Sequence, residues 1–192
     1  KFHHYSPREE LLTRPVKQSR CGIGREAFPI KHKYRIPFFL LVNILGGPGM
    51  NSRLNMALRE RNGFVYSVEA QYVPYSDTGQ FAVFFGTEPR HLLKCLNLIK
   101  KEFNKLCDKP MGSRQLASAR EQIKGQLAIA EEHNLNLMLI MGRSVMDFGR
   151  VPSLAELFDK IDAIDPLVLC EIAGKMLDER TLSCLIMEPN GM

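Results

Sequence analysis

The sequence contains no run of about 18 apolar residues, which a helix needs to cross a membrane, so we expect no membrane-spanning segment. It also contains no C-x-x-C pair, and its five cysteines are odd in number and widely spaced, unlike a zinc or redox site. We expect free thiols buried in a reducing compartment. This predicts a cytoplasmic protein, with the periplasm as the alternative because the sequence does not begin with methionine.

Four catalytic or cofactor motifs are missing as well. The glycine-rich stretch Leu45–Ser67 has neither the Gly-Lys pair of a phosphate loop nor G-x-G-x-x-G, which argues against nucleotide binding. The G-x-S-x-G motif of serine hydrolases is absent. Glu132-His133 matches only the end of the zinc motif H-x-x-E-H, because Ile129 stands where the first histidine is required. We therefore expect no metal site, and a solvated surface around Glu131.

The formal net charge of +5 is unevenly distributed along the chain. Residues 1–35 hold nine Lys and Arg against three Asp and Glu, whereas residues 36–192 hold seventeen against eighteen. No nucleic-acid-binding signature follows the basic segment, so we expect no nucleic-acid partner. Residues 1–17 are polar and interrupted by proline. They are predicted to be a linker from an upstream domain, and residues 18–192 to form one domain.

Hydrophobic patterns predict strands early in this domain, helices after them and one strand at the end. The apolar run IPFFLLVNIL predicts a buried helix over residues 35–45. Two aromatic and β-branched runs joined by PYSDTG predict an antiparallel hairpin. The other expected elements are a weak strand at 18–24, a short helix ending at Asn62-Gly63, a helix at 92–106, one long or two shorter helices within 113–149, helices starting at Ser153 and Asp165, and a strand at 181–187. This order is typical of an α+β fold.

Two polar residues of the glycine-rich stretch have an ordinary structural interpretation. Arg59 falls in the last turn of the short helix, where a cation is favourable against the helix dipole. Strand alternation places Tyr66 on the same face as Phe64 and Val68, where a packed tyrosine is common. The pattern alone favours a structural role for both residues over a functional one.

The longer stretch that contains Arg59 and Tyr66 favours a functional role instead. The sequence LGGPGMNSRLNMALRERNGFVYSV, followed by YSDTGQFAVFFGT, resembles the second-domain signature of the insulinase/pitrilysin family of zinc metallopeptidases, the inverzincins. Weaker similarity extends from about Gln18 to the final strand. The matching positions, in the order and spacing of that family, are Leu45-Gly46-Gly47, Ser52-Arg53-Leu54, Leu58-Arg59-Glu60, Gly63, Tyr66-Ser67, Asp77-Thr78-Gly79 and Gly86-Thr87.

This resemblance implies an antiparallel sheet covered by helices on one face, the α/β-roll of the processing peptidases. It implies that zinc is bound by the H-x-x-E-H motif of an upstream domain or partner subunit, that this chain holds none, and that it cuts nothing alone. Arg59 and Tyr66 are implied to reach across a closed chamber to the bound peptide. Tyr66 then serves as an oxyanion donor, and Arg59 holds peptide carbonyls.

The resemblance also bears on the glycine-rich turn and on partners. In related processing peptidases a glycine-rich loop touches substrate, so Gly47 and Gly49 are candidate substrate contacts. Their replacement by alanine is then expected to raise KM without unfolding the domain. The expected ligand is an extended peptide, the expected partner is the zinc-bearing domain or subunit, and a homodimer is left open. The alternative function is a non-catalytic partner or scaffold subunit of the same fold, as in respiratory complexes.

Overall fold

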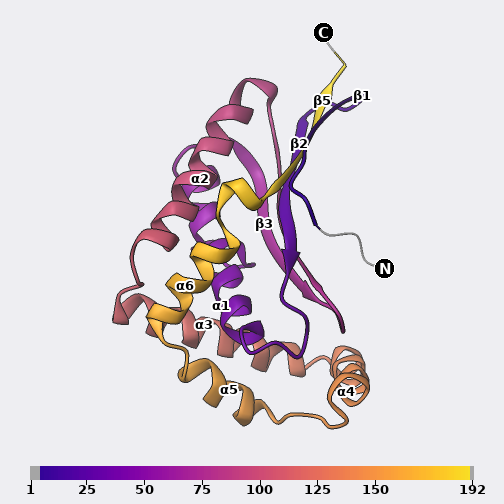
Figure 1. Cartoon of the computed structure of the whole chain (residues 1–192), viewed down its shortest axis with the longest axis vertical. Coiled ribbons are helices and arrows are strands. Elements are labelled where there is room, and N and C mark those ends of the chain that lie inside the picture. The colour runs from indigo at the N-terminus through magenta and orange to yellow at the C-terminus, as the bar shows by residue number, and fades with distance from the viewer. Residues whose placement is uncertain (1–4, 191–192) are drawn as a thin grey trace.

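The computed structural model describes residues 5–190, which form a five-stranded sheet with helices α1, α2 and α6 on one face (Figure 1). The strands are β1 (Glu9–Arg14), β2 (Ser19–Ala27), β3 (Val65–Pro74), β4 (Gly79–Thr87) and β5 (Ser183–Pro189). The helices are α1 (Arg35–Gly46), α2 (Leu92–Asp108), α3 (Ser113–Glu131), α4 (Asn134–Phe148), α5 (Leu154–Asp162) and α6 (Pro166–Met176). A π-helical turn, η1 (Asn55–Glu60), and two 3-10 turns, Pro89–His91 and Glu179–Thr181, join them. The predicted α+β class is confirmed.

The strand order across the sheet is β1-β5-β2-β4-β3. Most neighbours pair antiparallel, as expected, but β1 pairs in parallel with β5, so the expectation of an antiparallel sheet is wrong at this edge. The strand β1 also lies within residues 1–17, which the sequence predicts as a linker; residues 1–4 of that range are outside the described part. Its sequence, EELLTR, is exposed at all but one position and lacks strand alternation. β1 is a strand because its backbone pairs with the edge of β5.

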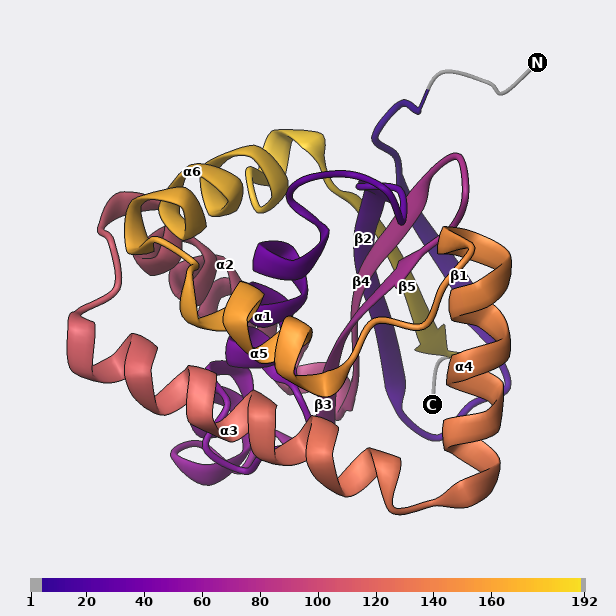
Figure 2. The same ribbon diagram turned by 90° about the horizontal axis from the view of Figure 1, so that it is seen from below.

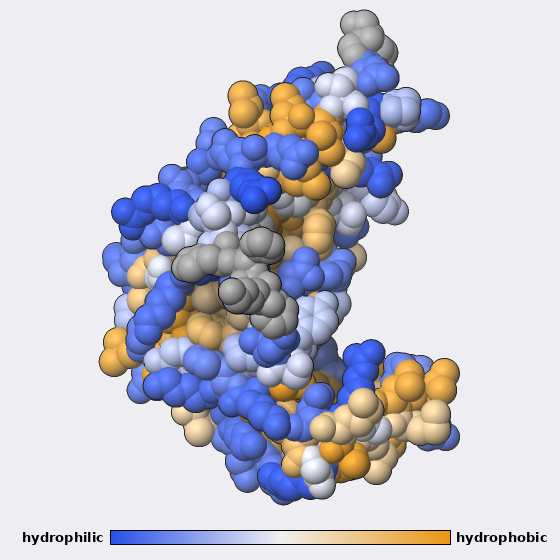
Figure 3. All heavy atoms as spheres, turned by 45° about the vertical axis from the view of Figure 1, so that its right-hand side comes forward, coloured by the Kyte–Doolittle hydropathy of each residue, from blue (hydrophilic) through white to orange (hydrophobic). Residues whose placement is uncertain are grey.

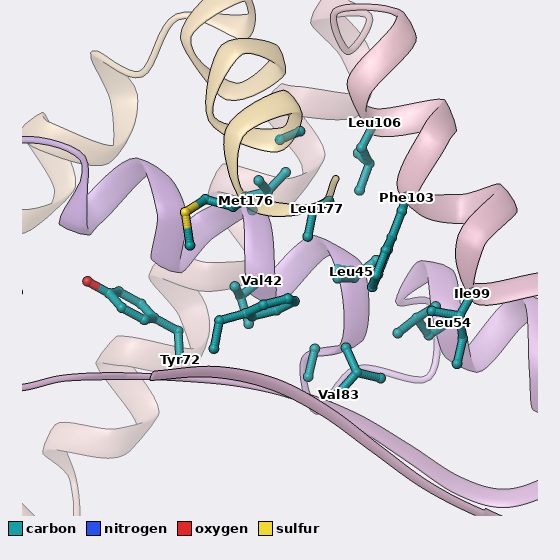
Figure 4. Close-up of a cluster of buried hydrophobic side chains, with 14 of the residues drawn as sticks. Val42, Leu45, Leu54, Tyr72, Val83, Ile99, Phe103, Leu106, Met176 and Leu177 are labelled. Atoms are coloured by element: carbon teal, nitrogen blue, oxygen red, sulfur yellow. The ribbon is translucent and has the colours of Figure 1, made fainter. Parts of the chain in front are cut away.

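The core lies between the sheet and the helices (Figure 4). Alternate residues of β4 point into it, among them the fully buried Phe81. Phe38 of α1 packs edge-on against the rings of Phe81 and Tyr72, at centroid distances of 5.5 and 4.7 Å. The Tyr72 hydroxyl donates to the Phe28 carbonyl at 2.6 Å. Burial raises the pKa of Tyr72 to about 12, so this part of the core stays uncharged near neutral pH.

Side-chain caps confirm two of the predicted helix starts. The Ser153 hydroxyl accepts a hydrogen bond from the backbone N–H of Glu156 at 3.2 Å, which begins α5. The Asp165 carboxylate accepts one from the backbone N–H of Leu167 at 2.6 Å, which begins α6. Both caps satisfy donors that a helix leaves unpaired at its start, so local sequence is enough to place these two ends.

Helix α4 lies apart from the core, on the side of the molecule away from α2 and α6 (Figure 2). A turn with exposed Glu132 and His133 separates it from α3, so the region 113–149 forms two helices. No residue of α4 is buried, although it carries the Leu- and Met-rich run 135–146. These side chains form an apolar patch at the surface (Figure 3). Of the described helices, none has both the length and the apolarity needed to cross a membrane.

We predict that Phe81→Ala lowers the free energy of unfolding by about 3–5 kcal/mol, because it leaves a cavity between the sheet and α1. The matched control is Phe84→Ala on the same strand, where the ring is 45% exposed on the other face of the sheet. That variant is expected to cost less than about 1 kcal/mol. Urea titration measures both, and equal losses would contradict the assignment of the core to one face.

Candidate functional site

The glycine-rich turn begins where α1 meets the sheet. α1 ends at Gly46, and the N–H of Gly47 donates to the carbonyl oxygen of Asn43 at 2.9 Å. A Cβ added at Gly46 would lie 2.8 Å from Ala70 of β3, and one added at Gly47 would lie 2.6 Å from that Asn43 oxygen. Real Cβ atoms do not approach backbone so closely. Both glycines are therefore required by packing, whatever else they contact.

Gly49 has different surroundings. A Cβ added there would meet only the ends of the Gln122 and Asn51 side chains, whose amides hydrogen-bond to each other at 2.9 Å. Flexible side chains can move aside, so Gly49→Ala is compatible with the fold. The expectation that alanine leaves the domain intact is therefore revised for Gly47, while contact of either glycine with peptide stays a prediction.

The predicted short helix carries Arg59 and is anchored by buried Leu54 and Leu58, which recur at helical spacing as expected. Over Asn55–Glu60 it widens into a π-helical turn, a rare form that is frequent at functional sites. Gly63 ends the segment with a φ of 61°, the left-handed conformation predicted for it. The π-helical turn places Arg59 at the surface, directly before the chain enters β3.

A β-bulge at the start of β3 turns Tyr66 to solvent. The pairing of β3 with β4 shifts register between Val65 and Val68, so both valines are buried while Tyr66 and Ser67 between them face outward. Tyr66 is 88% exposed. The interpretation of Tyr66 as a packed tyrosine is therefore wrong, because the bulge interrupts the alternation on which it depends.

Arg59 and Tyr66 lie together at the surface. The guanidinium carbon of Arg59 is 6.0 Å from the centroid of the Tyr66 ring, which is a cation–π distance. Its Nε lies 3.6 Å from a carboxylate oxygen of the neighbouring Glu60. Within residues 5–190 the Tyr66 hydroxyl has no hydrogen-bond partner. The pair thus presents a phenolic O–H and several N–H donors to solvent, from two segments that the loop brings together.

The described residues contain no group of three or more His, Cys, Asp and Glu side chains that fits a metal ion. The fragment of a zinc motif, Glu132-His133, offers one histidine in an exposed turn, whereas zinc needs three or four protein ligands. All five cysteines are free thiols. The Cys21 and Cys184 sulfurs lie 3.7 Å apart, and their hydrogen bond together with burial raises the pKa of Cys21. Cys21 is therefore a poor source of a thiolate ligand at neutral pH.

Comparison with known protein families decides the identity of the domain. Residues 2–123 match the family described as the peptidase M16 inactive domain, and the matched range includes Arg59, Tyr66 and the glycine-rich turn. The chain belongs to this family. The match confirms the resemblance that the stretch after Leu45 indicated, namely the second, non-zinc domain of a zinc metallopeptidase.

Relatives of this M16 inactive domain are named zinc proteases. It is 27% identical over 184 residues to the uncharacterized zinc protease YmxG of Bacillus subtilis, covering 95% of this chain and 44% of that protein. A crystal structure of a peptidase M16 inactive domain from Pseudomonas fluorescens matches with a TM-score of 0.83 at 17% identity, covering 96% of this chain and 44% of that one. A chain of Complex III2 from Candida albicans gives 0.80 at 18%, covering 95% and 46%. The chain thus spans less than half the length of each.

These comparisons confirm the fold and the non-catalytic character of the domain. At such identities the solved structures show the fold alone. The roles of Arg59, Tyr66, Gly47 and Gly49 stay predictions.

Two surface features of the M16 inactive domain were not predicted from its sequence. One is the exposed apolar face of α4. The other is a groove of about 550 Å³ between the segment 51–61, α2 and α3. The Leu- and Met-rich run indicates the helix but not its exposure, since periodicity shows which residues share a face and not what that face meets. The side chains of the groove come from separate elements, so no local motif marks them.

We predict that Gly47→Ala lowers the free energy of unfolding by roughly 1–3 kcal/mol, because the new Cβ overpacks the end of α1. Gly49→Ala is the matched control in the same turn, and it is expected to cost less than half as much because only side-chain ends must move. Urea midpoints of the two variants measure the difference. Wild-type stability of Gly47→Ala would show that the turn relaxes without cost.

Proposed function

We propose that this domain is the substrate-binding, non-zinc half of a zinc metalloendopeptidase. The full enzyme would hydrolyse peptides or small unfolded proteins together with a zinc-bearing H-x-x-E-H domain. The observation that carries the proposal is the surface pair of Arg59, whose side chain is 40% exposed, and Tyr66, which is 88% exposed. An arginine stacked on an exposed tyrosine contributes little to the fold, so the donors of both side chains remain available to a ligand.

An extended peptide suits these donors. The Arg59 guanidinium has five N–H donors in a fixed fork, which can hold peptide carbonyl oxygens. Main-chain hydrogen bonds to an extended peptide do not depend on its side chains, so recognition of this kind tolerates many sequences. The Tyr66 hydroxyl supplies one further donor, which would stabilise the negative charge that develops on the scissile carbonyl oxygen.

The partner domain supplies the rest of the chemistry. When held by an H-x-x-E-H motif, zinc provides an activated water for attack on the peptide bond. The described residues of this domain offer no ligand set of their own. Arg59 and Tyr66 would therefore act on the substrate, by orienting it and by binding the developing oxyanion. We also propose a cytoplasmic location, which the five free thiols support.

The alternative is a non-catalytic partner or scaffold subunit of the same fold. The similarity to the Complex III2 chain supports this alternative at the level of the fold. A scaffold has no use for an exposed phenol beside an arginine, and the bulge that exposes Tyr66 interrupts the ladder between β3 and β4. The geometry therefore favours the peptidase.

We propose that helix α4 is the surface on which the zinc-bearing domain docks. Seven large apolar side chains of α4 are exposed: Leu135, Met138, Leu139, Ile140, Met141, Val145 and Met146. A continuous apolar surface of this kind marks an interface in soluble proteins. The matching relative from B. subtilis is more than twice the length that this chain covers. We therefore propose that α4 docks against a domain equivalent to the remaining half of that relative.

We predict that Tyr66→Phe lowers kcat of the full-length enzyme by roughly 10²- to 10³-fold, because it removes one oxyanion donor. Zinc content is expected to stay unchanged. The control is Tyr75→Phe, which removes a hydroxyl from another exposed tyrosine of the same hairpin. Peptide hydrolysis with zinc measures both variants. An active enzyme indifferent to Tyr66→Phe would refute the assignment, and an inactive full-length protein would favour the scaffold.

We predict that Leu135→Glu/Leu139→Glu uncouples the two domains of the full-length protein. The two positions lie one helical turn apart, and charged side chains there would resist burial in an apolar interface. One cooperative unfolding transition should then become two in a urea titration. Leu167→Glu, at an exposed leucine of α6, serves as the control. A variant that instead dissociates a homodimer and keeps one transition would show that α4 binds a second copy.

A further inference from the structure

The groove beside the glycine-rich turn concentrates positive charge. Its volume is about 550 Å³, and four cationic side chains line it, Arg53, Arg61, Lys105 and Arg114, against the single carboxylate of Glu102. The excess is three positive charges. Residues 36–192, to which all these residues belong, carry one more negative than positive charge in total. Positive charge is therefore concentrated in the groove, and acidic residues elsewhere in the domain offset it.

The one carboxylate of the groove is already engaged. Glu102 is 7% exposed, and its two oxygens lie 3.6 Å from Arg53 and 2.5 Å from Lys105. Within residues 5–190, neither Arg61 nor Arg114 has a carboxylate within 4.0 Å. Like charges gathered in a recess raise the local potential and attract anions. Arg61 and Arg114 are thus available to an anionic ligand.

The lining of the groove indicates the kind of anion. Beside the cations it contains amides such as Asn43 and Gln115 and apolar side chains such as Ile44 and Met111. None of the described residues that line it is aromatic, whereas bases of nucleotides and single strands are commonly stacked on aromatic rings. The cations also come from three separate elements. A chain that carries several carboxylates and amide groups fits such a lining better than a nucleotide does.

We propose that this groove binds acidic side chains of the peptide substrate, as a subsite separate from Arg59 and Tyr66. The inference rests on the proposed function and deepens it, because it names a substrate class. Arg59 belongs to the same π-helical turn as Met56, which lines the groove, so the subsite adjoins the segment that carries Arg59. Arg61 and Arg114 select peptides with Asp or Glu residues, whereas Arg59 and Tyr66 bind the main chain of any peptide.

The test measures peptide binding to the full-length protein, with zinc removed by a chelator so that the probes are not cleaved. Two fluorescein-labelled peptides are used, identical except that Asp and Glu in one are Asn and Gln in the other. We expect Arg61→Gln/Arg114→Gln to raise Kd for the acidic peptide by roughly 3- to 10-fold, the range for two exposed ion pairs. Kd for the neutral peptide should change by less than about 2-fold, since no charge is lost from its contacts.

The control is Lys17→Gln/Lys101→Gln, which removes two exposed positive charges outside the groove. It is expected to leave both Kd values unchanged. An equal loss of acidic-peptide binding in the control, or no loss in Arg61→Gln/Arg114→Gln, would overturn the proposal. Tighter binding of tripolyphosphate than of the acidic peptide would overturn the peptide assignment. Because binding is measured without hydrolysis, a full-length protein that cleaves nothing would refute the proposed peptidase and leave this result standing.

Discussion

The close packing of α1 against β3 is the constraint on which the candidate site depends. Gly46 approaches β3 so nearly that a methyl group there would lie 2.8 Å from Ala70. α1 ends at this glycine, and the chain then passes through η1 into β3. Buried Leu54 and Leu58 fix η1 against the core. Arg59 consequently lies close to whatever the first residues of β3 present to solvent.

The domain has a well-packed core, whereas two of its surfaces have features that packing within the described residues does not explain. The sheet and three helices bury the large aromatic side chains, and side-chain caps satisfy the first backbone donors of α5 and α6. By contrast, α4 leaves an apolar face in water, and the groove leaves Arg61 and Arg114 without carboxylates among the described residues. Neither feature stabilises the isolated domain. Both agree with the proposal that the domain docks against a zinc-bearing domain, and the B. subtilis relative is more than twice the length that this chain covers.

Most elements are predictable because their signals are local. The run IPFFLLVNIL predicts α1. The cap residues Ser153 and Asp165 each predict the start of the helix that directly follows them. The strand β1 is not predictable in this way. Its residues are nearly all exposed, and it exists because the backbone of β5 offers unpaired groups at the sheet edge. A strand that owes its formation to pairing leaves almost no trace in hydrophobic periodicity.

The sequence by itself determined the family, the α+β class and the identity of Arg59 and Tyr66 as candidates, because their spacing belongs to a recognisable motif. Only the tertiary structure decided that Tyr66 faces solvent, since a bulge is set by how β3 pairs with β4 and not by the alternation of its own residues. The same holds for the cationic groove and for α4. A surface made of side chains from distant segments, or a face left without a partner, is defined by packing, which no short stretch of sequence contains.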